Sequence, residues 1–138
     1  MTTGGGKYAL ESWDGRDVYY TRMRSTPGIW RIPTGGGEET QVLLEPGLGW
    51  RGLSVSRSGL YYFRRLAERA EDTSSTEGRG AGYAVDFLDL ESGQVVRVFE
   101  DDDFYPWVDL AVSPDDRWIL TVKRPLPVSE LMLMENFR

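Results

Sequence analysis

Apolar and polar residues alternate with a period of two through most of the chain, and glycine or proline turns separate the alternating segments. Residues 16–20, 59–63 and 117–120 show the pattern most clearly, and Asp14-Gly15 and Ser58-Gly59 precede two of them. Alternation at this period is typical of β-strands, and such dipeptides supply the positive φ of tight turns. We therefore expect an almost entirely β protein with no helix longer than about two turns.

A short sequence is repeated. Residues 50–56, from Trp50 to Ser56, reappear 57 positions later as residues 107–113, with Trp, Leu, Val and Ser in the same places. A weaker third copy ends at Ser12, which precedes Ser56 by 44 positions. Each of these serines opens a polar turn that leads into a β-rich run, so each copy predicts strand, turn, strand.

Further strands follow in each copy. A third strand is predicted at residues 28–32, 83–90 and 130–134, and a fourth at residues 40–44 and 94–99. Four antiparallel strands every 40 to 45 residues or so indicate a propeller blade. The predicted fold class is thus all-β, a β-propeller segment of about three four-stranded antiparallel blades with the last blade incomplete. A single partial domain, residues 1–138, would hold blades at about residues 8–45, 50–100 and 107–138.

One stretch interrupts the second copy. Residues 66–82 lie between its second and third strands and are rich in Ser, Thr, Glu and Gly. Such a composition buries little apolar surface, so we expect a mobile inserted surface loop, and residues 67–82 should be the least ordered internal segment. This insertion explains the longer second repeat.

Two segments of the sequence resemble those of a known family. Residues 28–33 with 35–43, and residues 110–120, resemble the WD-like repeats of TolB-type bacterial β-propellers. The family has Gly where this chain has Asp116. The resemblance implies a non-catalytic scaffold whose propeller face binds a protein partner or a small ligand, without a cofactor. Residues 129–138 are also similar to the end of large bacterial propeller proteins, some with a winged-helix domain, which gives the alternative of a sensor or regulatory C-terminal portion of a transcription-linked protein.

Composition removes several kinds of enzyme. The chain has no His and no Cys, which excludes a Ser-His-acid triad, a histidine proton shuttle and a zinc site built on these residues. It also lacks the G-x-S-x-G turn of propeller-linked hydrolases, and the predicted inner strands supply hydroxyls where a lactonase needs several metal-binding carboxylates. We therefore expect no enzyme, and a propeller hydrolase fragment is the less favoured reading.

Charge and hydropathy limit the kinds of partner that we expect. The net charge is −6, with a basic excess in residues 1–69 and an acidic excess in residues 70–138, and the arginines are scattered. This argues against nucleic-acid contact by this segment. The acidic run at residues 100–103 is expected to be a solvated turn and no metal site is predicted. Neither a membrane span nor a secretory signal is visible, so the cytoplasm is slightly favoured.

The tryptophans of the repeat mark the candidate binding site. Trp50 and Trp107 take equivalent places at the start of the innermost strands, where loops from successive blades converge. Two interpretations stay open: packing between blades, or a ligand-facing surface formed with Arg51, Tyr105 and Asp109. Residues predicted to pack between blades come from strand interiors; they are Trp30, Trp118, Tyr19, Tyr20, Tyr61, Tyr62 and Phe63.

Three blades do not close a ring, since closed propellers have about four to eight. An open end leaves an apolar blade face and a strand edge in water. We expect these to be covered by the remaining blades of a longer chain or by a second copy, most simply as a two-fold homodimer.

Overall fold

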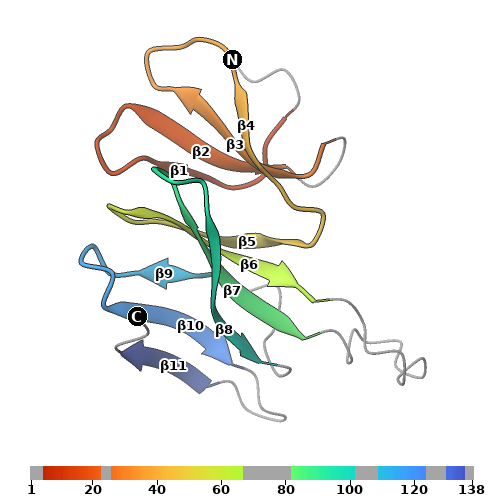
Figure 1. The fold of residues 1–138 in the computed structure, drawn as a ribbon, viewed down its shortest axis with the longest axis vertical. Coiled ribbons are helices and arrows are strands. Elements are labelled where there is room, and N and C mark those ends of the chain that lie inside the picture. The colour runs from red at the N-terminus through yellow and green to blue at the C-terminus, as the bar shows by residue number, and fades with distance from the viewer. Residues whose placement is uncertain (1–4, 23–25, 67–81, 102–108, 124–129, 136–138) are drawn as a thin grey trace.

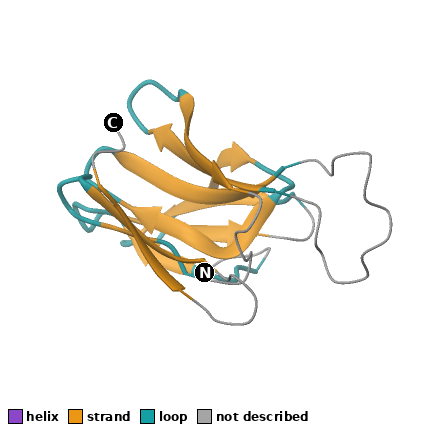
Figure 2. Ribbon diagram, turned by 90° about the horizontal axis from the view of Figure 1, so that it is seen from below, coloured by secondary structure: helices purple, strands orange, loops and turns teal. Residues whose placement is uncertain are grey.

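The described part of the structure, a computed structural model, consists of residues 5–22, 26–66, 82–101, 109–123 and 130–135. All of its regular structure is β, as Figure 2 shows, so the prediction of an all-β protein is confirmed for these residues. The strands, in chain order, are β1 (Ala9–Glu11), β2 (Asp17–Arg22), β3 (Gly28–Pro33), β4 (Thr40–Leu44), β5 (Leu48–Val55), β6 (Gly59–Arg65), β7 (Tyr83–Asp89), β8 (Val95–Asp101), β9 (Ala111–Val112), β10 (Trp118–Lys123) and β11 (Glu130–Glu135).

The strands form three antiparallel sheets that follow the chain. The first sheet has the order β1-β2-β3-β4, the second β5-β6-β7-β8, and the third β9-β10-β11. Figure 1 shows them stacked, with the second sheet between the other two. The strand β5 contacts β1 and β2 on one side and β9 on the other, so the first strands of successive sheets are neighbours. This arrangement confirms the predicted fold class.

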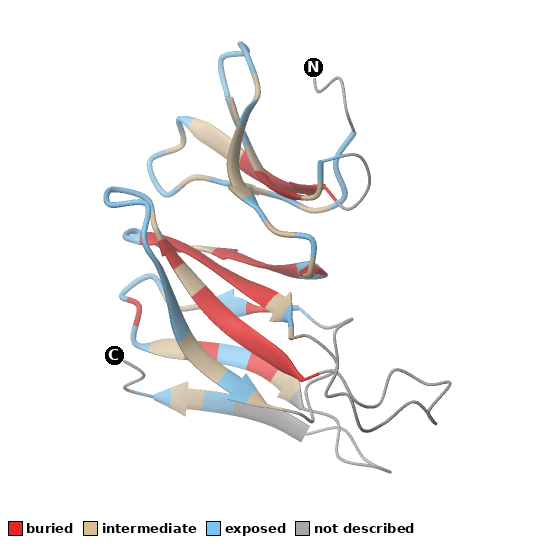
Figure 3. Ribbon diagram, turned by 45° about the vertical axis from the view of Figure 1, so that its right-hand side comes forward, coloured by how far each residue is buried: buried red, intermediate tan, exposed pale blue. Residues whose placement is uncertain are grey.

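The strand β6 explains why the sheets stack. Its side chains alternate, so Leu60 and Tyr62 enter an apolar cluster with Tyr19 and Ile29 of the first sheet. Tyr61 and Phe63 point the other way, into a second cluster that contains Ile119 of the third sheet. We call these contacts the first junction and the second junction. A strand that is apolar on both faces is stable only when both are covered, and Figure 3 shows β6 and β7 as the most extensively buried strands.

The repeated serines organise the turns between the first two strands of each sheet. Ser113 Oγ accepts a hydrogen bond from the Trp118 amide at 2.9 Å and donates to Asp115 Oδ1 at 2.7 Å. Ser12 makes the same pair of bonds, with the Asp17 amide and with Asp14. These serine hydroxyls lower the pKa of Asp14 and of Asp115. The serines thus recur because each one stabilises the polar turn between the first two strands of its sheet.

Asp116 occupies the glycine position of this turn. Its φ is +57°, and the equivalent residue of the first sheet, Gly15, has a φ of +71°. Aspartate tolerates the left-handed region better than most residues with a side chain. The buried carboxylate of Asp116 also accepts a hydrogen bond from Ser58 Oγ at 2.6 Å, which joins the third sheet to the second. The departure from glycine therefore keeps the turn and adds a contact across the second junction.

Several expectations are corrected or stay untested. Trp30 and Trp118 are only half-buried, since each lies on an outer face of the stack, whereas Tyr19, Tyr61, Tyr62 and Phe63 are buried between sheets as predicted. Tyr20 is buried, but on the outer face of the first sheet, so the expectation that it packs between blades is corrected. Glu100 and Asp101 lie within β8 rather than in a turn. Most of the predicted loop 66–82 lies outside the described residues, and the single-domain assignment of residues 1–138 stays a prediction.

Candidate functional site

The candidate site begins with an irregularity in β5. Leu48 pairs with Arg64 of β6, and Leu53 pairs with Tyr62, so residues 49–52 face the single residue Phe63. This is a large β-bulge, and bulges of this kind redirect side chains at functional edges of sheets. Trp50 and Arg51 are the two central residues of the bulge.

Two glycines make the bulge possible. A Cβ atom added to Gly52 would lie 2.3 Å from Cδ2 of Phe63, and one added to Gly49 would lie 2.9 Å from its Cβ. No other residue fits so close to a buried aromatic side chain without displacing it. The backbone of residues 49–52 is therefore packed against Phe63, which holds the bulge in place.

Arg51 extends from the bulge toward the third sheet. Its Nε lies 3.9 Å from Oδ1 of Asp109, and both side chains are more than half exposed. An exposed ion pair of this length adds little to stability. The pair is therefore better suited to presenting a positive and a negative group side by side than to holding the sheets together.

Hydrogen bonds at the second junction fix the strands that carry this pair. Ser54 Oγ accepts a hydrogen bond from the Val112 amide at 3.1 Å, which joins β5 to β9 directly. Ser54 is three residues after Arg51, and Val112 is three residues after Asp109. Arg51 and Asp109 are therefore each three residues before the hydrogen bond that joins β5 to β9.

The structure describes part of the predicted set. It brings Arg51 and Asp109 together, and it places the backbone of Trp50 in the bulge beside them. The side chain of Trp50 and all of Tyr105 and Trp107 lie outside the described residues. Whether the five residues form one site stays a prediction.

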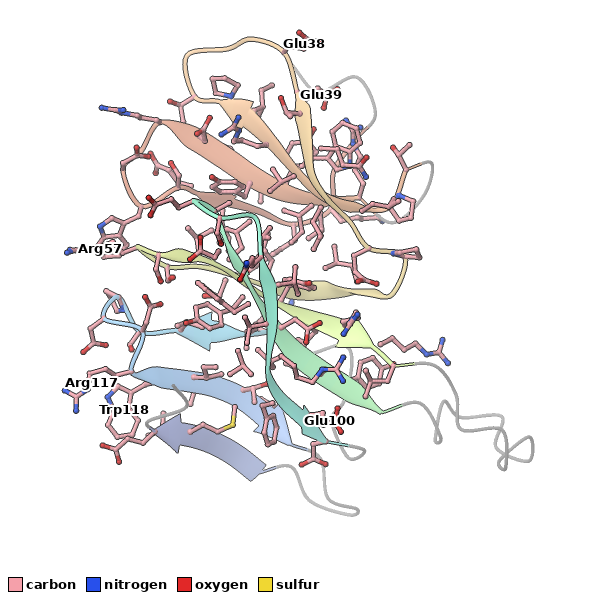
Figure 4. All side chains as sticks on the ribbon, in the orientation of Figure 1. Glu38, Glu39, Arg57, Glu100, Arg117 and Trp118 are labelled. Carbon is pink, nitrogen blue, oxygen red and sulfur yellow. The ribbon has the colours of Figure 1, made fainter. Side chains whose placement is uncertain are left out.

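The site lies at a definite end of the sheets. Leu48, at the start of β5, is opposite Arg64, near the end of β6. The Leu66 amide donates to the Gly82 carbonyl at 2.8 Å, so the connection between β6 and β7 leaves from the same end. The serine turns, with Arg57 and Arg117 labelled in Figure 4, lie at the opposite end.

Sequence reasoning missed a charged cluster at the first junction. Asp86 is 1% exposed and lies 2.8 Å from Nε of Arg64 and 3.2 Å from Nε of Arg97. Arg64 also approaches Glu45, between β4 and β5, at 3.9 Å, and the hydrogen bond to Asp86 raises the pKa of Arg97. A carboxylate inside the apolar run of β7 was the available signal, because a buried charge requires partners.

A second missed cluster lies on the outer face of the first sheet. Arg22 and Tyr20 both donate hydrogen bonds to Glu39, and the Arg22 guanidinium lies 4.0 Å from the centroid of the Trp30 ring. Burial and then the hydrogen bond to Glu39 raise the pKa of Tyr20 to about 12. Figure 4 shows Glu39 at this end of the stack.

The described ranges contain neither a cluster of metal ligands nor a membrane-spanning helix. Those residues contain no group of three or more acidic, His or Cys side chains that could hold a metal ion. They also contain no helix long and apolar enough to cross a membrane.

Comparisons with known proteins show the fold. No protein-family model and no curated protein matches the chain. Among solved structures, it is similar to TolB from Acinetobacter baumannii, with a TM-score of 0.69, 14% identity and 94% of this chain covered. It is also similar to an oligogalacturonate lyase in complex with manganese (TM-score 0.68, 16% identity, 94% covered) and to a prolyl endopeptidase (TM-score 0.61, 15% identity, 94% covered).

These likenesses support a β-propeller fold of the TolB type. The chain spans 29% of the TolB chain, 37% of the lyase and 20% of the peptidase. At such identities the comparisons concern architecture, and two of the three similar proteins are enzymes. Function has to be argued from the site.

Proposed function

We propose that this chain is a non-catalytic propeller module that binds a polypeptide segment at the start of β5 and β9. The observation that carries the proposal is the Arg51–Asp109 pair, displayed by a bulge that two glycines hold against Phe63. Opposite charges side by side, on segments joined by the partly buried hydrogen bond between Val112 and Ser54, match a ligand that itself carries both charges. A peptide with neighbouring acidic and basic residues has this chemistry.

Two further features favour binding over catalysis. The pair is exposed on both sides, whereas catalytic acids and bases are usually tuned by burial. The chain also has no His, the commonest general acid–base residue at neutral pH. We therefore expect a bound peptide to be recovered intact.

A peptide array tests the proposal. The probe is an immobilised set of ten-residue peptides in which acidic, basic, zwitterionic and uncharged sequences are equally represented. The wild-type chain should select zwitterionic peptides, Arg51→Ala should lose at least about tenfold in affinity, and the exchange Arg51→Asp with Asp109→Arg should recover much of it. Binding that is unchanged in Arg51→Ala, or no selection at all, would contradict the proposal.

The chain offers a matched control. Arg31 also lies 3.9 Å from a carboxylate, that of Asp17, and its side chain is about as exposed as that of Arg51. It belongs to the first sheet and is remote from the bulge. Arg31→Ala should therefore bind the selected peptides as the wild type does.

A further inference from the structure

The third sheet has an apolar outer face. Leu120 of β10 is 38% exposed, and Leu133 of β11, which pairs with it, is 57% exposed. Ala111 of β9 pairs with Leu120 from the other side and is also exposed. Ile119, on the inner face of β10, is fully buried against the second sheet. Because β10 is apolar on both faces, as β6 is, its outer face is suited to burial as well.

The two junctions inside the chain show what such a face packs against. Tyr19 of the first sheet shares a cluster with Tyr62 of the second, and Phe63 of the second shares a cluster with Ile119 of the third. Tyr19, Phe63 and Leu120 are separated by 44 and 57 positions, the spacings of the repeat. Leu120 is therefore the counterpart, on the last sheet, of the residues that enter the two junctions.

The same spacings identify the matching position on the other end of the stack. Tyr62 and Ile119 are 57 positions apart, and 44 positions before Tyr62 stands Val18. Val18 lies on the outer face of the first sheet and pairs with Ile32; both are half-buried. One more step of the internal packing would therefore set Leu120 against Val18.

The outer face of the first sheet also has the chemistry of a junction. Arg22, which pairs with Glu39, stands near the end of β2, as Arg64, which pairs with Asp86 of β7, stands near the end of β6. In the second sheet that charged cluster is at the first junction, where Glu45 approaches it. The presence of a similar cluster, Arg22 with Glu39, on the outer face of the first sheet indicates that this face too receives a neighbouring sheet.

We propose that the outer face of the third sheet, formed by Ala111, Leu120 and Leu133, docks on the outer face of the first sheet of a second copy of this chain. The two complementary faces lie on opposite ends of one stack, so two copies related by a two-fold axis satisfy both at once. The pair has about six blades, within the usual range of closed propellers. This assembly continues an interface that the chain already forms twice.

Cysteine cross-linking tests the contact, because the natural chain has no Cys. The variant with both Val18→Cys and Leu120→Cys carries its thiols on opposite ends of the stack, so a disulfide between them joins two chains. Under mild oxidation it should give covalent dimers and nothing larger, and either single variant should give none. Dimers from Leu120→Cys alone would show third sheets packed face to face, and a ladder of higher species would show an open chain of copies. Both results would overturn the proposal.

Sedimentation equilibrium gives an independent readout on the natural chain. The wild type should have twice the mass of one chain, and Leu120→Lys should reduce it to the mass of one. Val96→Lys is the control, since Val96 is 55% exposed but lies on β8 of the second sheet, which carries neither end face. A wild-type chain that is a monomer at every concentration and unfolds cooperatively would overturn the proposal. So would a Leu120→Lys variant that stays a dimer.

Discussion

The first and second junctions are held together by different chemistry. The first is an apolar cluster flanked by charged contacts: Asp86 with its two arginines, and Arg57 5.2 Å from the ring centroid of Trp13. The second adds direct hydrogen bonds between sheets, from the Val112 amide to Ser54 and from Ser58 to Asp116. Directional bonds fix position more narrowly than apolar contact does. The comparison explains why an exposed ion pair can keep its geometry at the second junction.

The largest expected effect is the loss of stability when a side chain in either apolar cluster is truncated. Phe63→Ala leaves a cavity in the second cluster and removes the support of the bulge, and Leu60→Ala leaves a cavity in the first cluster. Each should lower the free energy of unfolding by about 2–5 kcal/mol. Only Phe63→Ala should also abolish peptide selection by Arg51. Urea unfolding gives the stabilities. An equal loss of peptide binding in Leu60→Ala would show that the bulge does not depend on Phe63.

The charged cluster of the first junction gives the next effect. Asp86→Asn leaves two arginines beside a neutral group at a buried position, which should destabilise by about 1–3 kcal/mol. Glu100→Gln is the matched control, because Glu100 contacts Arg97 at an exposed site and should matter by less than about 0.5 kcal/mol. Denaturant titration of the three proteins measures the difference. Similar stabilities for both variants would contradict the role of the cluster at the junction.

Substitutions of Asp116 test the hydrogen bond that it accepts across the second junction. Asp116→Gly keeps the positive φ but loses the bond from Ser58, at a cost of about 1 kcal/mol. Asp116→Ala loses the bond and also strains the turn, so it should cost about 1 kcal/mol more. Thermal unfolding should therefore rank wild type, glycine and alanine in that order. If the Asp116→Gly variant proved as stable as the wild type, the hydrogen bond between the sheets would not contribute to stability.

The smallest effect concerns Tyr20, which belongs to neither junction. Its pKa of about 12 lies above that of an unfolded tyrosine, so its contribution to stability is complete below about pH 10 and is lost as the pH rises toward 12. Glu39→Gln should lower this pKa without bringing it to 10, since burial persists. Ultraviolet titration of the phenols measures the shift. An unchanged titration curve would contradict the bond from Tyr20 to Glu39.

Local patterns were sufficient to predict most of the fold. Tyr61, Tyr62 and Phe63 were expected to be buried because apolar residues occupy both faces of their strand, and the repeated serines predicted the turns. Trp30 was misjudged because alternation tells which residues share a face but not whether another sheet covers that face. Glu100 and Asp101 were misjudged because β8 is an outer strand, where charged residues stay in water within regular structure.

The candidate site was less accessible from sequence. Arg51 and Asp109 were named from the repeat, and the structure brings them together. The bulge was not foreseen, because the reason for Gly49 and Gly52 is the ring of Phe63, which lies on another strand. The partners of Asp86 were hidden for the same reason: they come from β6 and β8, on either side of its own strand.

The glycines at positions 49 and 52 also divide the bulge into fixed and variable parts. The outer two positions have no room for a side chain beside Phe63, whereas the inner two carry Trp and Arg. Variation at position 51, where the side chain is more than half exposed, could therefore alter ligand preference without disturbing the contact of the two glycines with Phe63. For protein engineering, a library randomised at the exposed positions 51 and 109 would explore specificity while Gly49 and Gly52 are kept.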